Sequence, residues 1–351
     1  MLPTSLAIVQ PRPCPREPMA TIKQLIEQAG GTAKESVETA KTRYLEQVRG
    51  VLRDLTRLKF SDRQGVESQH TSVPIRVVAG LPQPLESMAS EELPSGERWG
   101  IETIGLWAQD IKSLHGVAER LKPLIATLGQ VPEWKDRAND YTHKLHGATM
   151  LAEDLGEYAA KAELLKRITQ INQDILGVYM PTARLIPDKG QIELYWVVIG
   201  AVARLLGVDA EALTVVVMAH ELAHAYTHLG LDSNSNRWED GFWECNRGIL
   251  EGLAQYYTHM TATALKEERG YDRVWDAYDQ LTQLQKTNGT KIYVNHLDWV
   301  KTISPEVMRQ GLLDLRRGHI PPHFGNFEDF LKMSADRYPL NSKPAGRRRQ
   351  V

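Results

Sequence analysis

Apolar residues recur at helical spacing over most of the chain. Between Lys34 and Lys59, apolar positions follow one another at steps of three and four, which predicts a long amphipathic helix with a coiled-coil-like seam. The seam residues are Val37, Tyr44, Val48, Val51, Leu55 and Leu58. We favour packing of this seam within its own domain, with helix-mediated self-association as the alternative.

Two stretches have the composition of strands instead. Residues 73–79 predict one short strand, and GVYMPTARLIPDKGQIELYW predicts two strands around the turn signal Pro187–Gly190. Helical patterns return in VVIGAVARLLG and in DAEALTVVVMAHELAHAYTHLG, the latter beginning at an Asp209 N-cap and stopping at Gly230. The predicted fold class is therefore mostly α with a small β-sheet (α+β).

Helices are also expected downstream of Gly230. One runs from about Phe242 to Lys266, and Ser304-Pro305 opens another that ends near Gly318. We divide the chain into a disordered Pro-rich leader (1–18), a helical N-terminal region (19–170) with a loop-rich connection at 61–98, a C-terminal domain (171–340) and a frayed basic tail (341–351).

Composition and charge exclude several classes of protein. The 351 residues are 42% hydrophobic and 25% charged with a net charge of −2, which gives no reason to expect nucleic acid or a membrane as the main partner. The apolar run LYWVVIGAVA is too short to span a bilayer, and the opening residues lack the features of a signal peptide. Because Cys14 and Cys245 are the only cysteines, we expect a protein without disulfides in the cytoplasm.

The motif HELAH carries the candidate chemistry. Residues four apart lie on one face of a helix, so His220 and His224 can reach a single metal ion with Glu221 beside them. The preceding run of valines predicts a buried helix, in which two imidazoles and a carboxylate are costly unless they pair or bind metal.

A zinc site needs a third protein ligand. His228 lies about 12 Å from His220 along a straight helix, too far to share one ion, and we interpret it as a charged histidine at the helix end. Glu251 in ILEGLAQYY is the favoured ligand, because the small Gly252 and Ala254 would let its helix approach the HELAH helix. Glu244, one heptad earlier, is the alternative.

HELAH followed by LEGLAQYY resembles the gluzincin metallopeptidases, over about residues 175–260. The resemblance implies a zincin-like domain in which His220, His224 and Glu251 bind one Zn²⁺ and Glu221 is the general base of peptide hydrolysis. The candidate donors to the reacting carbonyl oxygen are Tyr256, Tyr257, Tyr293 and His296, and we single out Tyr257 and His296 as catalytic candidates.

The resemblance also suggests how a peptide would bind. IELYW (192–196) is expected to be an exposed edge strand that pairs with an extended peptide or protein substrate, with an interior strand as the alternative. The predicted function is a zinc-dependent metallopeptidase. The competing hypothesis is a non-catalytic zinc-binding interaction protein, which would not need Glu221.

Overall fold

The computed structural model describes residues 22–60, 73–86, 116–160, 175–181, 190–238, 240–287, 289 and 291–337. The predicted leader, the basic tail and most of the 61–98 connection lie outside the described residues. The elements are α1 (Ile22–Gly30), α2 (Lys34–Thr56), β1 (Ile75–Val78), α3 (Gln83–Glu86), a helix over 116–128, the 3₁₀ helix η1 (Pro132–Trp134), α5 (Lys135–Ala160), β2 (Gly177–Met180), β3 (Gln191–Tyr195), α7 (Trp196–Leu206), α8 (Ala210–Leu229), α9 (Asp240–Glu244), α10 (Arg247–Arg269), α11 (Asp272–Thr287), α12 (Lys291–Val294), α13 (His296–Thr302), α14 (Pro305–Arg316) and α15 (Phe324–Arg337).

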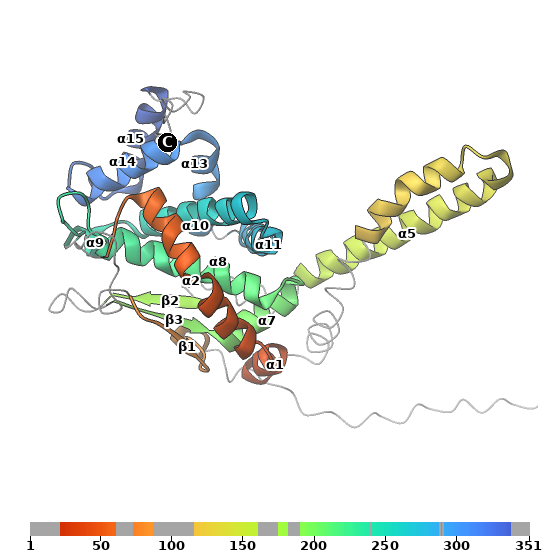
Figure 1. The fold of residues 1–351 in the computed structure, drawn as a ribbon, viewed down its shortest axis with the longest axis horizontal. Coiled ribbons are helices and arrows are strands. Elements are labelled where there is room, and N and C mark those ends of the chain that lie inside the picture. The colour runs from red at the N-terminus through yellow and green to blue at the C-terminus, as the bar shows by residue number, and fades with distance from the viewer. Residues whose placement is uncertain are drawn as a thin grey trace, which may run out of the picture.

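The fold is mostly helical with one three-stranded sheet, as predicted (Figure 1). β1 pairs with β3 in parallel, and β2 pairs with β3 antiparallel, giving the order β1-β3-β2. The three predicted strands are thus confirmed, but the position expected for 192–196 is wrong. β3 is the central strand, because both of its edges are already paired.

Helix α8 occupies the centre of the body. Asp209 caps it as predicted, with its side chain accepting a hydrogen bond from the backbone N–H of Ala212 at 2.9 Å. Every residue from Ala212 to Leu229 is buried, and α8 is packed by α2, α7, α10, α11 and β2. A helix that is enclosed on all sides has no solvent face for its polar residues.

The seam of α2 faces inward. Val37, Tyr44 and Val48 are buried in the hydrophobic core, and α2 packs along α8. The Tyr226 hydroxyl of α8 donates to the carbonyl of Arg49 on α2 at 3.3 Å, which fixes the two helices together. The preferred interpretation of the seam, packing within its own domain, matches the structure.

Elements from both sides of residue 170 pack together. α1 packs on α7, α2 packs on α8, and β1 supplies one edge of the sheet that β2 and β3 complete. The part of the N-terminal region that stands apart is the helical hairpin of residues 116–160, which projects from the body (Figure 1).

The single helix expected over 242–266 is two helices. α9 ends at Glu244, and Asn246 starts α10 by accepting a hydrogen bond from the N–H of Gly248. An asparagine that satisfies a free amide at a helix start favours a new helix over continuation of the old one. Downstream, Ser304 caps α14 through the N–H of Val307, as predicted.

A search of the described helices finds none that combines the length and apolar character needed to cross a membrane.

Candidate metal centre

Two helices bring three ligand atoms together. His220 and His224 lie one turn apart on α8, and their Nε2 atoms are 3.2 Å from each other. Glu251 reaches them from α10, with Oε2 at 3.4 Å from Nε2 of His220 and 3.5 Å from Nε2 of His224. The three atoms form a nearly equilateral triangle.

The size of this triangle fits a bound metal ion. Zinc binds imidazole nitrogen and carboxylate oxygen at about 2.0–2.2 Å in tetrahedral geometry, which places neighbouring ligand atoms about 3.4 Å apart. The three observed separations of 3.2, 3.4 and 3.5 Å lie around that value. Glu251 Oε2 is also buried without a hydrogen bond, as expected of a ligand atom.

The triad of His220, His224 and Glu251 is buried, which makes a charge on any of the three side chains costly. His220, His224 and Glu251 are only 7, 6 and 4% exposed. Burial by itself raises the pKa of Glu251, but His224 and His220 outweigh that effect and hold its pKa well below the usual range. The carboxylate is therefore charged, and a divalent cation would compensate a charge that the protein has taken out of water.

The structure places Glu251, and not Glu244, beside the two histidines. Glu244 is exposed at the end of α9, because the break before Asn246 puts it in a different helix from Glu251. The expectation that the small Gly252 lets α10 approach α8 is wrong. A Cβ atom on Gly252 would lie 2.6 Å from the Trp299 ring of α13, so this glycine accommodates α13 and not α8.

Arg247 is a site residue that the sequence argument missed. Its Nε donates to Glu251 Oε1 at 3.4 Å, and its Nη2 donates to the Tyr293 hydroxyl at 3.4 Å. The guanidinium thus holds the second carboxylate oxygen while Oε2 faces the histidines. Its position four residues before Glu251 on a helix was the available signal.

Tyr293 is the donor candidate that lies at the triad. It is buried on α12, and its ring centroid is 6.4 Å from that of His220. The contact with Arg247 ties its hydroxyl to the same network as Glu251.

Glu221 lies between α8 and the sheet and is 2% exposed. Gly177 of β2 makes this approach possible, since a Cβ atom there would lie 3.0 Å from Glu221 Cγ and 2.8 Å from Val217 Cγ1. Glu221 is among the charges that raise the pKa of Tyr195 to about 12, after burial and Glu193. The predicted base is therefore next to the strand β2.

His296 is a fully buried neighbour of the site. Its Nε2 is 2.6 Å from the Tyr278 hydroxyl, which is in turn 3.2 Å from Nδ1 of His259. Burial, then His259 and more weakly His220, lower the pKa of His296 to about 3. The structure brings His296 near His220 but gives its Nε2 a hydrogen-bonding partner in the core.

Two other candidate donors, Tyr256 and Tyr257, have their hydroxyls away from the predicted ligands. Tyr257 is fully buried, and its charged neighbours are Arg309 and Arg316 of α14. Tyr256 donates to the carbonyl of Ile303 at 3.1 Å. The structure does not bring either hydroxyl to the three predicted ligands.

The interpretation of His228 as a charged histidine at the helix end is wrong. His228 is 7% exposed, stacks on Phe242 with ring centroids 3.9 Å apart, and bonds the Tyr179 hydroxyl through Nδ1 at 2.9 Å. Burial, followed by the charge of Arg316, lowers its pKa to about 4. Enclosure by aromatic rings outweighs the helix dipole, so this imidazole is neutral.

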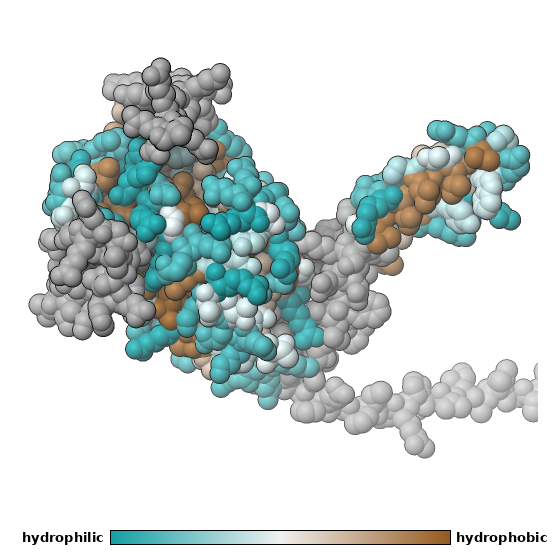
Figure 2. All heavy atoms as spheres, in the orientation of Figure 1, coloured by the Kyte–Doolittle hydropathy of each residue, from teal (hydrophilic) through white to brown (hydrophobic). Residues whose placement is uncertain are grey.

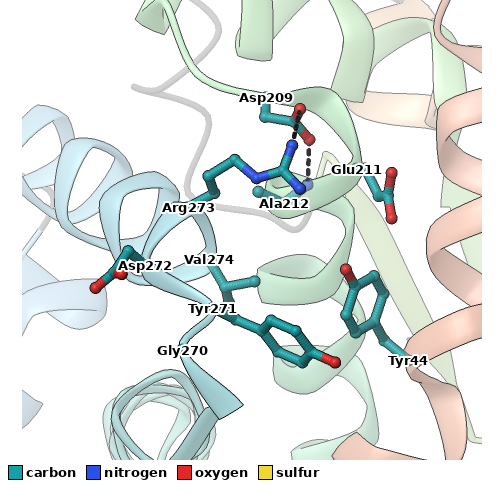
Figure 3. A pocket seen from close by; sticks show the side chains of 9 residues that line it. All are labelled: Tyr44, Asp209, Glu211, Ala212, Gly270, Tyr271, Asp272, Arg273 and Val274. Atoms are coloured by element: carbon teal, nitrogen blue, oxygen red, sulfur yellow. Dashed lines mark hydrogen bonds and ion pairs between the residues drawn. The ribbon is translucent and has the colours of Figure 1, made fainter. Parts of the chain in front are cut away.

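A separate pocket of about 220 Å³ lies at the opposite end of α8 (Figure 3). Tyr44 and Tyr271 form part of its wall, and Asp209 and Glu211 stand at its edge. These carboxylates are already paired with Arg273 and Arg43. The start of α8 is about 15 Å from His220, so this pocket is not the metal centre.

None of the protein-family models, curated proteins or solved structures compared with this chain matches it.

Proposed function

We propose that this protein is a zinc-dependent metallopeptidase of the gluzincin type, with a zincin-like fold built around α8 and α10. The observation that carries the proposal is the triangle of His220 Nε2, His224 Nε2 and Glu251 Oε2, whose sides of 3.2–3.5 Å suit one tetrahedral ion. Two imidazoles and one carboxylate also leave a fourth position open, which distinguishes catalytic from structural zinc sites.

The chemistry that a bound zinc ion supplies is Lewis acidity, which lowers the pKa of water toward about 7 and polarises a carbonyl group. Glu221 follows His220 directly on α8, and its carboxylate accepts a proton from the attacking water and delivers it to the leaving amine. Tyr293 is placed to donate a hydrogen bond to the carbonyl oxygen as negative charge develops on it.

The edge of β2 supports a peptide substrate. The N–H of Tyr195 donates to the carbonyl of Leu176, so alternate residues from Leu176 onward pair with β3. The backbone groups of Gly177 and Tyr179 then face away from β3. An extended peptide that adds to this edge runs beside Glu221, which Gly177 approaches closely.

Arg247 has a positioning role in this proposal. By binding Oε1 of Glu251, it keeps Oε2 directed at the histidines. A partner of this kind fixes the orientation of a metal ligand and typically changes metal affinity without touching substrate.

Metal content and peptide hydrolysis by Glu221→Gln test the proposal. We expect wild type to bind one zinc ion and to cleave members of a peptide library. Glu221→Gln should keep the zinc and lose at least about 100-fold in rate, because general acid–base catalysis contributes that much. Glu244→Gln, an exposed glutamate outside the triad, is the matched control and should retain both properties.

The alternative, a non-catalytic zinc-binding interaction protein, makes a different prediction for the same samples. It requires zinc in wild type and in Glu221→Gln with no cleavage by either. Absence of zinc from wild type supplied with the ion would contradict both functions.

A further inference from the structure

The helical hairpin of residues 116–160 carries most of the exposed apolar side chains of the described chain. Ten large hydrophobic residues are well exposed among the described residues, and eight of them lie on this hairpin. They are Val117 (41% exposed), Leu121 (38%), Leu124 (55%), Val131 (40%), Trp134 (42%), Tyr141 (40%), Met150 (45%) and Leu151 (54%). Figure 2 shows a brown band of hydrophobic residues along the projecting hairpin.

This band is not the face that joins the two helices of the hairpin. Over residues 116–151, whose side chains the structure describes, the buried positions are the small residues Ala118, Ala138 and Thr149. In the first helix the exposed residues Val117, Leu121 and Leu124 follow one another at steps of four and three, a spacing typical of helices that pack on further helices. One face of each helix thus packs against the other helix of the hairpin, and a second, apolar face is exposed and suited to packing against another helical structure.

The exposed area is that of an interface. Met150 lies nine residues from Tyr141, on the opposite face of α5. Large side chains of this kind present on the order of 150–200 Å² each, so at these exposures the other seven offer on the order of 500 Å² of apolar surface. Monomeric proteins rarely leave more than a few hundred Å² of contiguous apolar surface, whereas one side of a stable interface covers about 800 Å². The apolar band, together with its polar rim, reaches the size of one such side.

The charges of the hairpin favour a second copy over nucleic acid or an anionic membrane. Residues 116–160 contain five basic and seven acidic residues, so the hairpin is weakly acidic. Within α5, residues 135–144 contain three basic and two acidic side chains, and residues 145–160 contain three acidic and none basic. Two copies of α5 in antiparallel contact would place the weakly basic outer half against the acidic inner half.

We propose that two copies of this chain pair through their 116–160 hairpins, side by side and antiparallel, to form a four-helix bundle. The contact is isologous, because each hairpin gives the other the same apolar band. Four helices with short loops and apolar seams pack stably in this arrangement. The two metal centres then lie at opposite ends of the bundle, each in its own body.

Sedimentation equilibrium of the full chain tests the proposal. Wild type should have twice the 39.6 kDa mass of one chain. Leu124→Glu combined with Leu151→Glu should have the mass of a single chain, since each copy would bring charges into the seam. Met333→Glu is the matched control, because Met333 is equally exposed at 59% but lies on α15. A monomeric wild type at every soluble concentration overturns the proposal, and so does a double variant that remains dimeric.

A second measurement does not depend on the folding of a variant. Amide hydrogen exchange of wild type is compared at low and high protein concentration. We expect slower exchange at high concentration in residues 116–160 and unchanged exchange in α8 and α10. Concentration-dependent protection confined to any other surface overturns the proposal.

Discussion

Arg247 and Glu251 face each other one turn apart on α10, with the guanidinium Nε 3.4 Å from Oε1 of the carboxylate. The other oxygen of the same carboxylate lies 3.4 Å from His220. One glutamate therefore joins the two histidines of α8 to a cation on its own helix. This relationship makes Arg247 part of the candidate metal centre, although it is not one of the three candidate ligands.

Replacing Arg247 should weaken metal binding. Without the guanidinium, Glu251 can rotate and its two oxygens become equivalent, so we expect Arg247→Met to lower zinc affinity about 10- to 100-fold. Competition with a zinc-binding dye measures the change. Arg273→Met removes an exposed arginine that pairs with Asp209, and its affinity should equal that of wild type. Equal affinity in Arg247→Met would show that the contact does not orient Glu251.

The ligand set predicts which variants lose the metal. His224→Ala and Glu251→Ala should each lose most of the bound zinc, because two ligands are too few for a tight site. Glu244→Ala should keep it, since that side chain is exposed on α9. Elemental analysis of the purified proteins decides between the two glutamates. Zinc retained in Glu251→Ala and lost in Glu244→Ala would reverse the assignment.

Removal of the metal should destabilise the protein. A chelator leaves the charged Glu251 buried beside two imidazoles, with only the 3.4 Å contact to Arg247 to offset its charge. Ligand binding to the native state alone stabilises by mass action. We expect the midpoint of thermal unfolding of wild type to fall on chelation. That of His224→Ala should not respond to chelator, and a similar decrease in both proteins would contradict a metal at this site.

His228 should make the protein less stable in acid. Its pKa is about 4 in the folded state against 6.5 unfolded, so between these values the unfolded chain binds a proton that the folded chain does not. The free energy of unfolding should therefore decrease as the pH falls from 6.5 to about 4, by up to about 3 kcal/mol from this residue. Buried His296, with its pKa lowered to about 3, contributes with the same sign.

Urea unfolding of His228→Gln in the presence of chelator measures this contribution. Glutamine can still bond the Tyr179 hydroxyl but does not titrate, so the decrease between pH 6.5 and 4 should be smaller than in wild type. His143→Gln, at an exposed position of α5, should keep the wild-type dependence. Identical slopes in His228→Gln and wild type would mean that His228 is not held neutral.

Gly177 and Gly50 should respond to alanine in opposite directions. A Cβ atom on Gly177 would lie 2.8 Å from Val217 Cγ1 and 3.0 Å from Glu221 Cγ, so Gly177→Ala forces β2 away from α8. We expect a loss of about 1–3 kcal/mol in the free energy of unfolding and slower peptide hydrolysis. Gly50 lies within α2 with nothing within 4 Å of a Cβ atom, and Gly50→Ala should gain about 0.5–1 kcal/mol. A neutral Gly177→Ala would contradict the close packing of β2 against Glu221.

Local chemistry in the sequence determined most of the elements and two of the three candidate metal ligands. A spacing of four on a helix puts His220 and His224 on one face wherever that helix lies, and the caps at Asp209 and Ser304 act through neighbouring backbone amides. β-branched and aromatic residues on either side of a turn signal were enough to predict the two strands β2 and β3, which the structure pairs antiparallel. None of these features depends on distant parts of the chain.

Tertiary structure decided what depends on contacts between distant segments. β3 is central because β1, from far upstream, pairs with its free edge, and no local pattern distinguishes a central strand from an edge. His228 is neutral because β2 and α9 enclose it, which its position at a helix end could not indicate. Glu251 is the residue beside the histidines, and not Glu244, because a helix break before Asn246 puts the two glutamates on different helices and α10 packs against α8. The spacing of residues along the chain determines which side chains share one face of a helix or strand. Tertiary packing alone determines which other segments that face contacts.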